Sequence, residues 1–192
     1  MAASWFRLRD GTADDLPALA GLDSSISNEW VLHLDRRGGP IEQTIELRWR
    51  RLEPAGSRRD FQMDVVELTR ELQRSERLVI AEAGGGIAGY LLLGTNWNGT
   101  AELADVIVDL AYRRRGLGRR FVEEAETYAR ARGLRALQWE AQTDNRDAIE
   151  FAVSQGFRIA GFHYAFYGNR GHERQEEPGF RGLAVFLTKE LG

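Results

Sequence analysis

The chain has 192 residues, of which 43% are hydrophobic and 29% are charged, a balance that indicates a globular protein with enough apolar material for a sizeable core. Its formal net charge is −3, so the chain as a whole has no general attraction to nucleic acid or to anionic membranes. The sequence contains no cysteine and only three widely spaced histidines (His33, His163 and His172), which excludes disulfides, thiolate zinc sites and a cysteine nucleophile and argues against a histidine metal site.

The first 76 residues have a weak hydrophobic period that turn-forming residues interrupt. Thr12 followed three residues later by Asp15 is typical of a helix N-terminus. The sequence Gly38-Gly39-Pro40 breaks the chain, and the stretch before it, which contains Trp30 and His33, has no readable period. The predicted elements are a strand, a helix, a strand and a helix, at residues 5–9, 12–22, 41–49 and 60–74.

From residue 77 onward the pattern is stronger. Gly84-Gly85-Gly86 and Asn98-Gly99 are hairpin turns between strands, and Gly133 and Gly156 are well placed to end helices. We predict strands at 77–83, 87–97, 102–108, 134–141, 157–167 and 182–189, and helices at 116–132 and 146–155. A meander of strands followed by alternating helices and strands predicts one α/β domain, a mixed sheet with helices on its faces.

Residues 113–118 read Arg-Arg-Arg-Gly-Leu-Gly and join a predicted strand to a predicted helix. The glycines allow close backbone approach, and the amide groups that begin a helix have no intrahelical acceptors, so this turn can bind an anion such as a pyrophosphate. A P-loop would need a GKS or GKT ending, and a dinucleotide fingerprint would need GxGxxG; neither is present. A solvated basic helix start explains the same residues, and both interpretations stay open at this point.

The neighbouring residues favour the anion site. The pattern Arg-x-x-Gly-x-Gly after a strand ending Val-x-Val resembles the acetyl-CoA pyrophosphate loop of the GNAT superfamily of N-acetyltransferases. The resemblance extends to Asn145-Arg146-Asp147-Ala148 and to Gly156-Phe157, and it covers residues 77–189. Within the superfamily the chain is most similar to the streptothricin acetyltransferase group, through the strings TNWN at 95–98 and WEAQTDN at 139–145.

The resemblance implies a GNAT fold for a single domain over residues 1–192, with residues 1–76 on the substrate side. In this fold a central, twisted sheet is mixed but mostly antiparallel, carries helices on both faces, and is splayed between its two central strands. Here these strands would be 102–108 and 134–141.

The resemblance also assigns residues to the co-substrate acetyl-CoA. The end of the strand at 106–108 would pair through its backbone with the pantetheine arm, the loop would hold the pyrophosphate, and Asn145 would contact the pantetheine region. The implied cofactor-binding residues are Val106, Ile107, Val108, Arg113, Arg114, Arg115, Gly116, Leu117, Gly118, Arg119 and Asn145. No metal is expected.

Direct acetyl transfer needs a neutral amine, and a lysine-like amine has a pKa of about 10.4, so a base is required near neutral pH. Glu140 is the first candidate, beside the implied splay, and a matching glutamate occurs in streptothricin-type and some ribosomal-protein acetyltransferases. Asp105 is the second candidate and Glu102 the third. A surface ion pair of Glu140 with an arginine, and a solvated Glu102, are the alternatives.

Alternation along the strand predicts which way the second candidate base faces. It places Asp105 on the same face as Leu103 and Ile107, opposite Val106 and Val108.

One position departs from the family pattern. Many members carry a tyrosine seven residues after the asparagine, as general acid for the leaving thiolate, and Ala152 stands there. A CoA thiol resembles that of cysteine, with a pKa of about 8.5, so its thiolate can leave without a dedicated acid. Water, Tyr164 or Tyr167 could serve instead, and a protein that binds acetyl-CoA without turnover is an alternative.

We therefore predict a cytoplasmic N-acetyltransferase that moves acetyl from acetyl-CoA directly to a primary amine of a small molecule, such as streptothricin or another amino-bearing antibiotic. A protein N-terminus or lysine is the alternative acceptor. We expect no nucleic-acid or membrane partner and leave a homodimer open, and a nucleic-acid-binding domain built on residues 113–120 ranks last because the chain is net acidic.

Acidic and aromatic side chains of the substrate-side regions complete the prediction. The acidic residues that could attract a cation are Asp23, Glu29, Asp35, Glu173, Glu176 and Glu177. Trp30, Trp49 and Trp97 could line a substrate wall, although core packing is the expected role of each.

Overall fold

The computed structural model describes residues 5–27, 29–52, 63–167 and 182–192. Its contacts divide the chain into two compact units. The first comprises Met1–Ser25, Asp60–Trp139 and Thr188–Gly192, and the second comprises Ile26–Arg59 and Glu140–Leu187. These units are groups of contacts, and the single domain over residues 1–192 stays a prediction. Within the described ranges, no helix is long and apolar enough to span a membrane.

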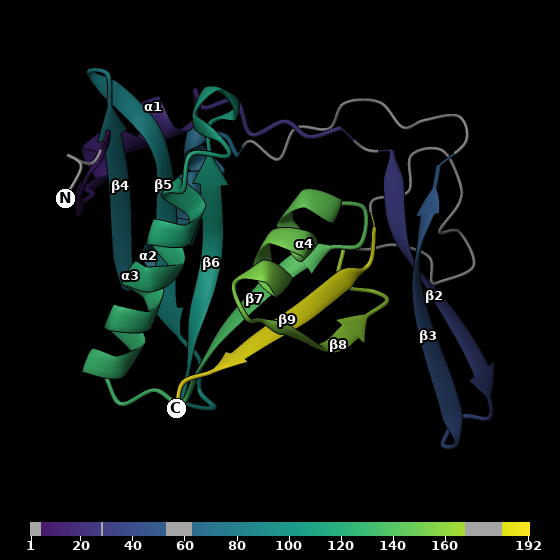
Figure 1. Ribbon diagram of the computed structural model, residues 1–192. Helices are drawn as coiled ribbons and strands as arrows, with labels where there is room; N and C mark the ends of the chain where they lie inside the picture. The colour runs from purple at the N-terminus through teal and green to yellow at the C-terminus, as the bar shows by residue number, and fades with distance from the viewer. Residues whose placement is uncertain (1–4, 28, 53–62, 168–181) are drawn as a thin grey trace. The chain divides into compact units, whose positions relative to one another are not determined.

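The first unit is a sheet in the order β1-β4-β5-β6-β7. The first four strands are antiparallel neighbours, and β6 and β7 are parallel (Figure 1). The strands are β1 (Arg7–Asp10), β4 (Arg77–Ala83), β5 (Gly86–Thr95), β6 (Thr100–Val108) and the beginning of β7 (Ala136–Gln142). This mostly antiparallel, mixed arrangement confirms the predicted fold class.

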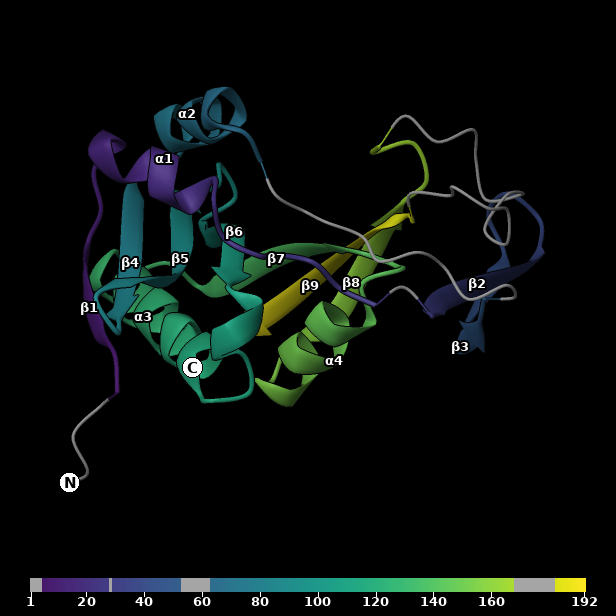
Figure 2. The same ribbon diagram turned by 90° about the horizontal axis from the view of Figure 1, so that it is seen from above.

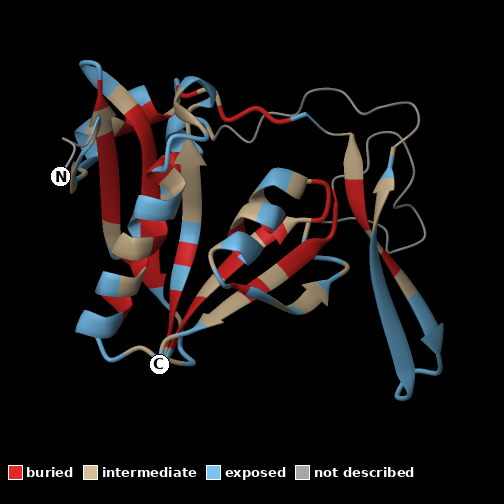
Figure 3. Cartoon of the chain, in the orientation of Figure 1, coloured by how far each residue is buried: buried red, intermediate tan, exposed pale blue. Residues whose placement is uncertain are grey.

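Helices cover both faces of this sheet. Figure 2 shows α1 (Leu16–Leu19) and α2 (Val65–Arg74) on one face of β4 and β5, and α3 (Leu117–Ala131) on the other. Two 3₁₀ turns, Ala13–Asp15 and Leu110–Tyr112, precede α1 and the loop before α3. Because both faces are covered, β4 and β5 are buried along most of their length (Figure 3).

The core on the α1/α2 side is made of alternate strand residues and the inner faces of the two helices. It contains Leu16, Leu19, Leu22, Leu68, Leu78, Ile80, Tyr90 and Leu92. On the opposite side α3 buries Leu117, Phe121, Val122, Ala125, Tyr128 and Ala129. A polar side chain that either of these apolar layers buries needs a hydrogen-bond partner.

A β-bulge in the β5–β6 pair changes the direction of the β6 side chains. Leu93 lies opposite Leu103, but the next residue of β5, Leu92, lies opposite Asp105, so Ala104 is an extra residue. The Asp105 side chain is consequently on the same face of the sheet as that of Ile107, and the Leu103 side chain is on the other face. The prediction from simple alternation was wrong for Leu103, because one inserted residue reverses the faces before and after it.

The parallel pairing of β6 with β7 is short. It joins Thr100–Leu103 to Ala136–Trp139 and ends there, whereas β6 continues to Val108. The last four residues of β6 remain paired with β5 on the other side, through Gly89–Leu92. Backbone pairing of the two central strands therefore ends after Leu103, and their splay stays a prediction.

The second unit contains the rest of β7, α4 (Arg146–Ser154), β8 (Arg158–His163) and the beginning of β9 (Ala184–Glu190), with strand order β7-β9-β8. A separate hairpin joins β2 (Trp30–Gly38) to β3 (Gln43–Arg51). Sequence periodicity missed β2, because Val31 and Leu32 are adjacent and both buried, so the strand does not alternate. Strand β8 is shorter than the predicted 157–167.

Candidate active site

The Arg-Arg-Arg-Gly-Leu-Gly loop begins α3 with an unusual backbone. Gly116 is the N-cap residue at φ 88°, and Arg114, two residues earlier, is at φ 61°. The first intrahelical bond runs from the Arg120 amide to the Gly116 carbonyl at 3.1 Å, so the amides of the preceding turn have no intrahelical acceptor. A Cβ built on Gly116 would meet no atom within 4 Å. The loop therefore offers free donors, the positive end of a helix and open space, which fits a phosphate group.

The Arg113 side chain contacts backbone carbonyls of its own unit. Its guanidinium donates to Val108 O at 2.9 Å, to Ser25 O at 2.7 Å and to Asp23 O at 3.4 Å. Asp109 adds to this network, because its carboxylate accepts from the Asp23 and Ala111 amides at 2.9 Å each. These contacts join the end of β6 to residues 23–25 and fix the start of the loop.

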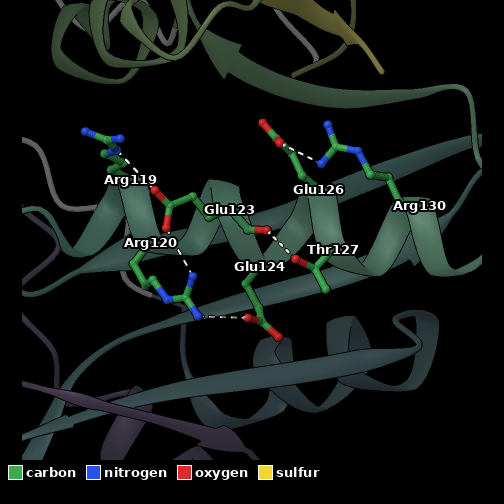
Figure 4. Close-up of polar contacts among 7 residues, drawn as sticks. All are labelled: Arg119, Arg120, Glu123, Glu124, Glu126, Thr127 and Arg130. Carbon is green, nitrogen blue, oxygen red and sulfur yellow. Dashed lines mark hydrogen bonds and ion pairs between the residues drawn. The ribbon is translucent and has the colours of Figure 1, made fainter. Parts of the chain in front are cut away.

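The two arginines at the start of α3 are paired with glutamates of the next turn (Figure 4). Arg119 lies 3.1 Å from Glu123, and Arg120 lies 3.1 Å from Glu123 and 3.9 Å from Glu124. Such exposed pairs are weak, but they reduce the positive field of the helix start. Neither Arg114 nor Arg115 pairs with a carboxylate in the described part of the chain. These two arginines therefore carry most of the loop's uncompensated charge.

The end of β6 can pair with an extended ligand. Val106, Ile107 and Val108 lie opposite Leu91, Tyr90 and Gly89 of β5. Their other edge lies beyond the last β6–β7 pair, Leu103 with Trp139. Amide groups along such an edge can bond an extended amide chain such as a pantetheine arm.

Asp105 is held in the α1/α2 face of the sheet by Tyr90. The Tyr90 hydroxyl donates to the Asp105 carboxylate at 2.5 Å. The pKa of Asp105 is raised to about 6, mainly by burial and to a smaller extent by Glu71, and the hydrogen bonds from Tyr90 and the Val106 amide oppose the rise. Burial also raises the pKa of Tyr90, and burial and Glu71 raise that of Glu102 on the same face. Sequence reasoning did not identify Tyr90 as the partner, because the bulge decides which β5 residue faces Asp105.

The raised pKa of Asp105 makes stability depend on pH. Its folded value of about 6 exceeds the ordinary value of 3.8, so this contribution to the unfolding free energy is fully present below about pH 4 and is lost as the pH rises through 6. The rise in pKa from 3.8 to about 6 corresponds to about 3 kcal/mol of unfolding free energy. We expect urea unfolding of Asp105→Asn to show a smaller loss of stability between these pH values than the wild type shows. An equal loss in both proteins would contradict the burial of this charge.

Glu140 belongs to the second unit, on β7. The Tyr167 hydroxyl donates a hydrogen bond to its carboxylate. Burial raises the pKa of Glu140 to about 7, although the Tyr167 bond opposes the shift. No arginine within the described ranges pairs with Glu140, so the alternative of a simple ion pair is not observed there. A carboxylate with this pKa can act as a base near neutral pH.

The second unit also contains Asn145 and Ala152, two positions that the sequence analysis singled out. Asn145 caps α4, and its side-chain oxygen accepts from the Ala148 amide at 3.1 Å, which leaves its amide NH₂ as the side chain's donor group. Ala152 is fully buried, and its methyl group cannot act as the general acid that the family tyrosine supplies. Gln142, two residues after Glu140 on β7, has a buried Oε1 with no partner among the described residues. Sequence reasoning gave Gln142 no role.

Three of the acidic residues that were predicted to attract a cationic substrate have hydrogen-bond or ion-pair partners nearby. Asp23 accepts from Ser25, Asp35 pairs with Arg48, and Glu29 lies 3.7 Å from Arg51. The remaining attractors, Glu173, Glu176 and Glu177, lie outside the described residues, as does His172.

The three tryptophans differ in their surroundings. Trp30 and Trp49 lie against the Arg146 guanidinium, with ring centroids 4.8 and 5.2 Å from it. Trp97 is 98% exposed, so the expectation of core packing was wrong for it; the residue lies in the turn between β5 and β6. No group of three or more acidic or histidine side chains in the described ranges could hold a metal ion.

Comparisons with known proteins show which family the chain resembles. Residues 41–157 match the sequence pattern of the Acetyltransferase (GNAT) family. A streptothricin acetyltransferase of Streptomyces lavendulae is 27% identical over 174 residues, which are 88% of this chain and 90% of that protein. Five further curated relatives are matched over 23% to 55% of their own length, so the chain spans about half of each at most.

Two solved structures share the fold. A nourseothricin acetyltransferase superposes with a TM-score of 0.78 at 22% identity, over 98% of this chain and all of that one. A Bacillus anthracis str. Ames protein, named only provisionally as a streptothricin acetyltransferase and solved in complex with acetyl coenzyme A, has a TM-score of 0.76 at 23% identity, over 97% and 99% of the two chains. The family match covers more than half of this chain, from β3 to α4. The chain therefore belongs to the acetyltransferase (GNAT) family, the enzymes that transfer an acetyl group from acetyl-CoA.

Proposed function

We propose that the protein transfers the acetyl group of acetyl-CoA directly to a primary amine of a cationic small molecule, such as streptothricin or another amino-bearing antibiotic. The observation that carries the proposal is Glu140, a half-buried carboxylate whose pKa is raised to about 7 by desolvation and which accepts a hydrogen bond from Tyr167. The streptothricin acetyltransferase of S. lavendulae, which aligns over most of both chains, supports the choice of acceptor.

The proposed reaction separates proton removal from acetyl transfer. Glu140 takes one proton from the substrate ammonium, whose pKa is about 10.4, and so provides a nitrogen lone pair. The amine attacks the thioester carbonyl, a C–N bond forms, and the C–S bond breaks. The CoA thiolate leaves, and the second proton of the nitrogen passes to solvent or to the thiolate. A thiol pKa of about 8.5 makes this departure possible without the tyrosine that Ala152 replaces.

The donor site of the proposal lies in the first unit. The amides of the first turn of α3, together with Arg114 and Arg115, would bind the pyrophosphate, and the edge of Val106–Val108 away from β5 would pair with the pantetheine arm. Arg113 would act through the backbone carbonyls that it holds. In the second unit, Asn145 would offer its amide NH₂ to the pantetheine.

An assay of CoA thiol release with acetyl-CoA and a panel of amines tests this function. The panel contains streptothricin, other aminated antibiotics, a lysine peptide and a peptide with a free N-terminus. We expect turnover with at least one small cationic amine. Turnover with the peptides alone would replace the acceptor by a protein, and heat protection by acetyl-CoA without any turnover would favour a non-catalytic acetyl-CoA sensor.

A further inference from the structure

Trp5, two residues before β1, contacts the phosphate loop although it lies 110 positions from Arg115 in the sequence. Trp5 donates a hydrogen bond from its indole Nε1 to the Arg115 carbonyl at 3.0 Å. Its ring is stacked on the Tyr112 ring, with the centroids 5.7 Å apart and the planes 7° from parallel. Both contacts lie within the first unit.

The Arg115 guanidinium also lies near these rings. It is 5.8 Å from the centroid of the Trp5 ring and 5.9 Å from that of Tyr112, within the range of a cation–π interaction. Phe6 supports the Trp5 ring edge-on at 4.9 Å. Trp5 therefore engages both the backbone and the side chain of one arginine of the loop.

The loop needs such support, because it has little regular structure of its own. Arg115 lies between Arg114 and Gly116, which both have a left-handed backbone. A non-glycine residue in that region is strained, so a loop that must keep this conformation needs contacts that fix it. Arg115 is also one of the two loop arginines without a described carboxylate partner. Fixing it in advance reduces the entropy lost when an anion binds.

We propose that Trp5 is a positioning residue for the nucleotide end of acetyl-CoA, which holds Arg115 and the adjoining amides in the conformation that binds the pyrophosphate. This inference rests on the acetyl-CoA site of the proposed function, but it does not depend on the acceptor amine. It predicts that the N-terminal segment influences the affinity for CoA and has no effect on a donor that lacks the nucleotide.

The test compares two ligands in four proteins. The proteins are the wild type, Trp5→Ala, Trp5→Phe, which keeps a ring but loses the N–H donor, and Trp97→Ala, which makes the same change at a fully exposed tryptophan. Dissociation constants for CoA are measured by titration calorimetry, and those for S-acetylpantetheine, which has no pyrophosphate, by ligand-observed NMR.

We expect Trp5→Ala to weaken CoA binding about tenfold and S-acetylpantetheine binding by less than about twofold, with Trp5→Phe intermediate for CoA and Trp97→Ala unchanged for both. Wild-type CoA affinity in Trp5→Ala would overturn the proposal, and so would an equal loss for both ligands, which would indicate a general structural role. Absence of CoA binding in the wild type would overturn it together with the donor site. Absence of turnover with every amine would overturn the proposed acetyl transfer and leave this inference standing.

Discussion

Replacement of Glu140 by glutamine is expected to lower kcat by about 10² to 10⁴ at neutral pH, because the substrate ammonium then has no positioned base. Glutamine keeps the size of the side chain and an oxygen that can accept from Tyr167, so binding and folding should change little. The measurement is steady-state kinetics with the best amine of the panel, together with the dissociation constant of acetyl-CoA. We expect the loss in kcat without a change in that constant.

The pH dependence of kcat/KM is a second measurement of the role of Glu140. A base with a pKa of about 7 must be ionised to act, so wild-type kcat/KM should rise with pH through about 7 and then level off. Glu140→Gln should remove this rise. Glu150→Gln, at an exposed glutamate of α4, is the matched control and should behave as the wild type. An undiminished rate in Glu140→Gln would remove Glu140 from the mechanism and leave Asp105 as the next candidate.

Replacement of Gly89 by alanine is expected to weaken acetyl-CoA binding at least about tenfold. A Cβ at this position of β5 would lie 2.4 Å from the Ile107 carbonyl oxygen and 3.2 Å from the Val108 Cα. These are backbone atoms, so the end of β6 has to move. That segment is the proposed pairing edge for pantetheine, and a displacement costing about 1.4 kcal/mol accounts for a tenfold loss. Titration calorimetry on protein with wild-type circular dichroism measures the effect.

Gly94 on the same strand provides the control. A Cβ there would come no closer than 3.7 Å to a neighbouring atom, so Gly94→Ala should bind acetyl-CoA as the wild type does. Thermal unfolding distinguishes the clash at position 89 from the general effect of adding a methyl group to β5. Gly89→Ala should lower Tm, and Gly94→Ala should not. Wild-type affinity in Gly89→Ala would show that the end of β6 does not hold the donor.

The part of the fold after residue 77 could be predicted because its signals are local. The hairpin glycines, the helix-ending Gly133 and the Asn145 cap each determine the backbone within a few residues. Strand β4 begins and ends where its pattern predicted. Strand β2 could not be found in this way, because Val31 and Leu32 are buried one after the other. Its position depends on pairing with β3, which periodicity within one segment does not contain.

The candidate site was predictable as a set of residues but not as a set of contacts. The spacing of Arg113, Gly116 and Gly118 indicated an anion site, and the helix start at Gly116 agrees with it. The run of arginines did not reveal that Arg113 holds backbone carbonyls or that Arg119 faces Glu123. These roles depend on residues 23–25 and on the geometry of α3.

Long-range partners were the least predictable part. Tyr90 faces Asp105 only because Ala104 forms a bulge, and a single inserted residue carries no clear sequence signal. Trp5 and Arg115 meet across 110 residues, and Tyr167 meets Glu140 across 27. Pairs of this kind follow from tertiary structure. The Tyr90 and Tyr167 hydrogen bonds oppose the rise that burial causes in the pKa values of Asp105 and Glu140.

The most direct test of direct acetyl transfer to an amine is mass spectrometry of protein and product after mixing. Acetyl-CoA alone should leave the protein unmodified. Acetyl-CoA with streptothricin should give an amine that carries one additional acetyl group and an equal amount of free CoA. An acetylated protein that forms without the amine and disappears when the amine is added would contradict direct transfer. Bound CoA with no acetylated amine would contradict the proposed acceptor.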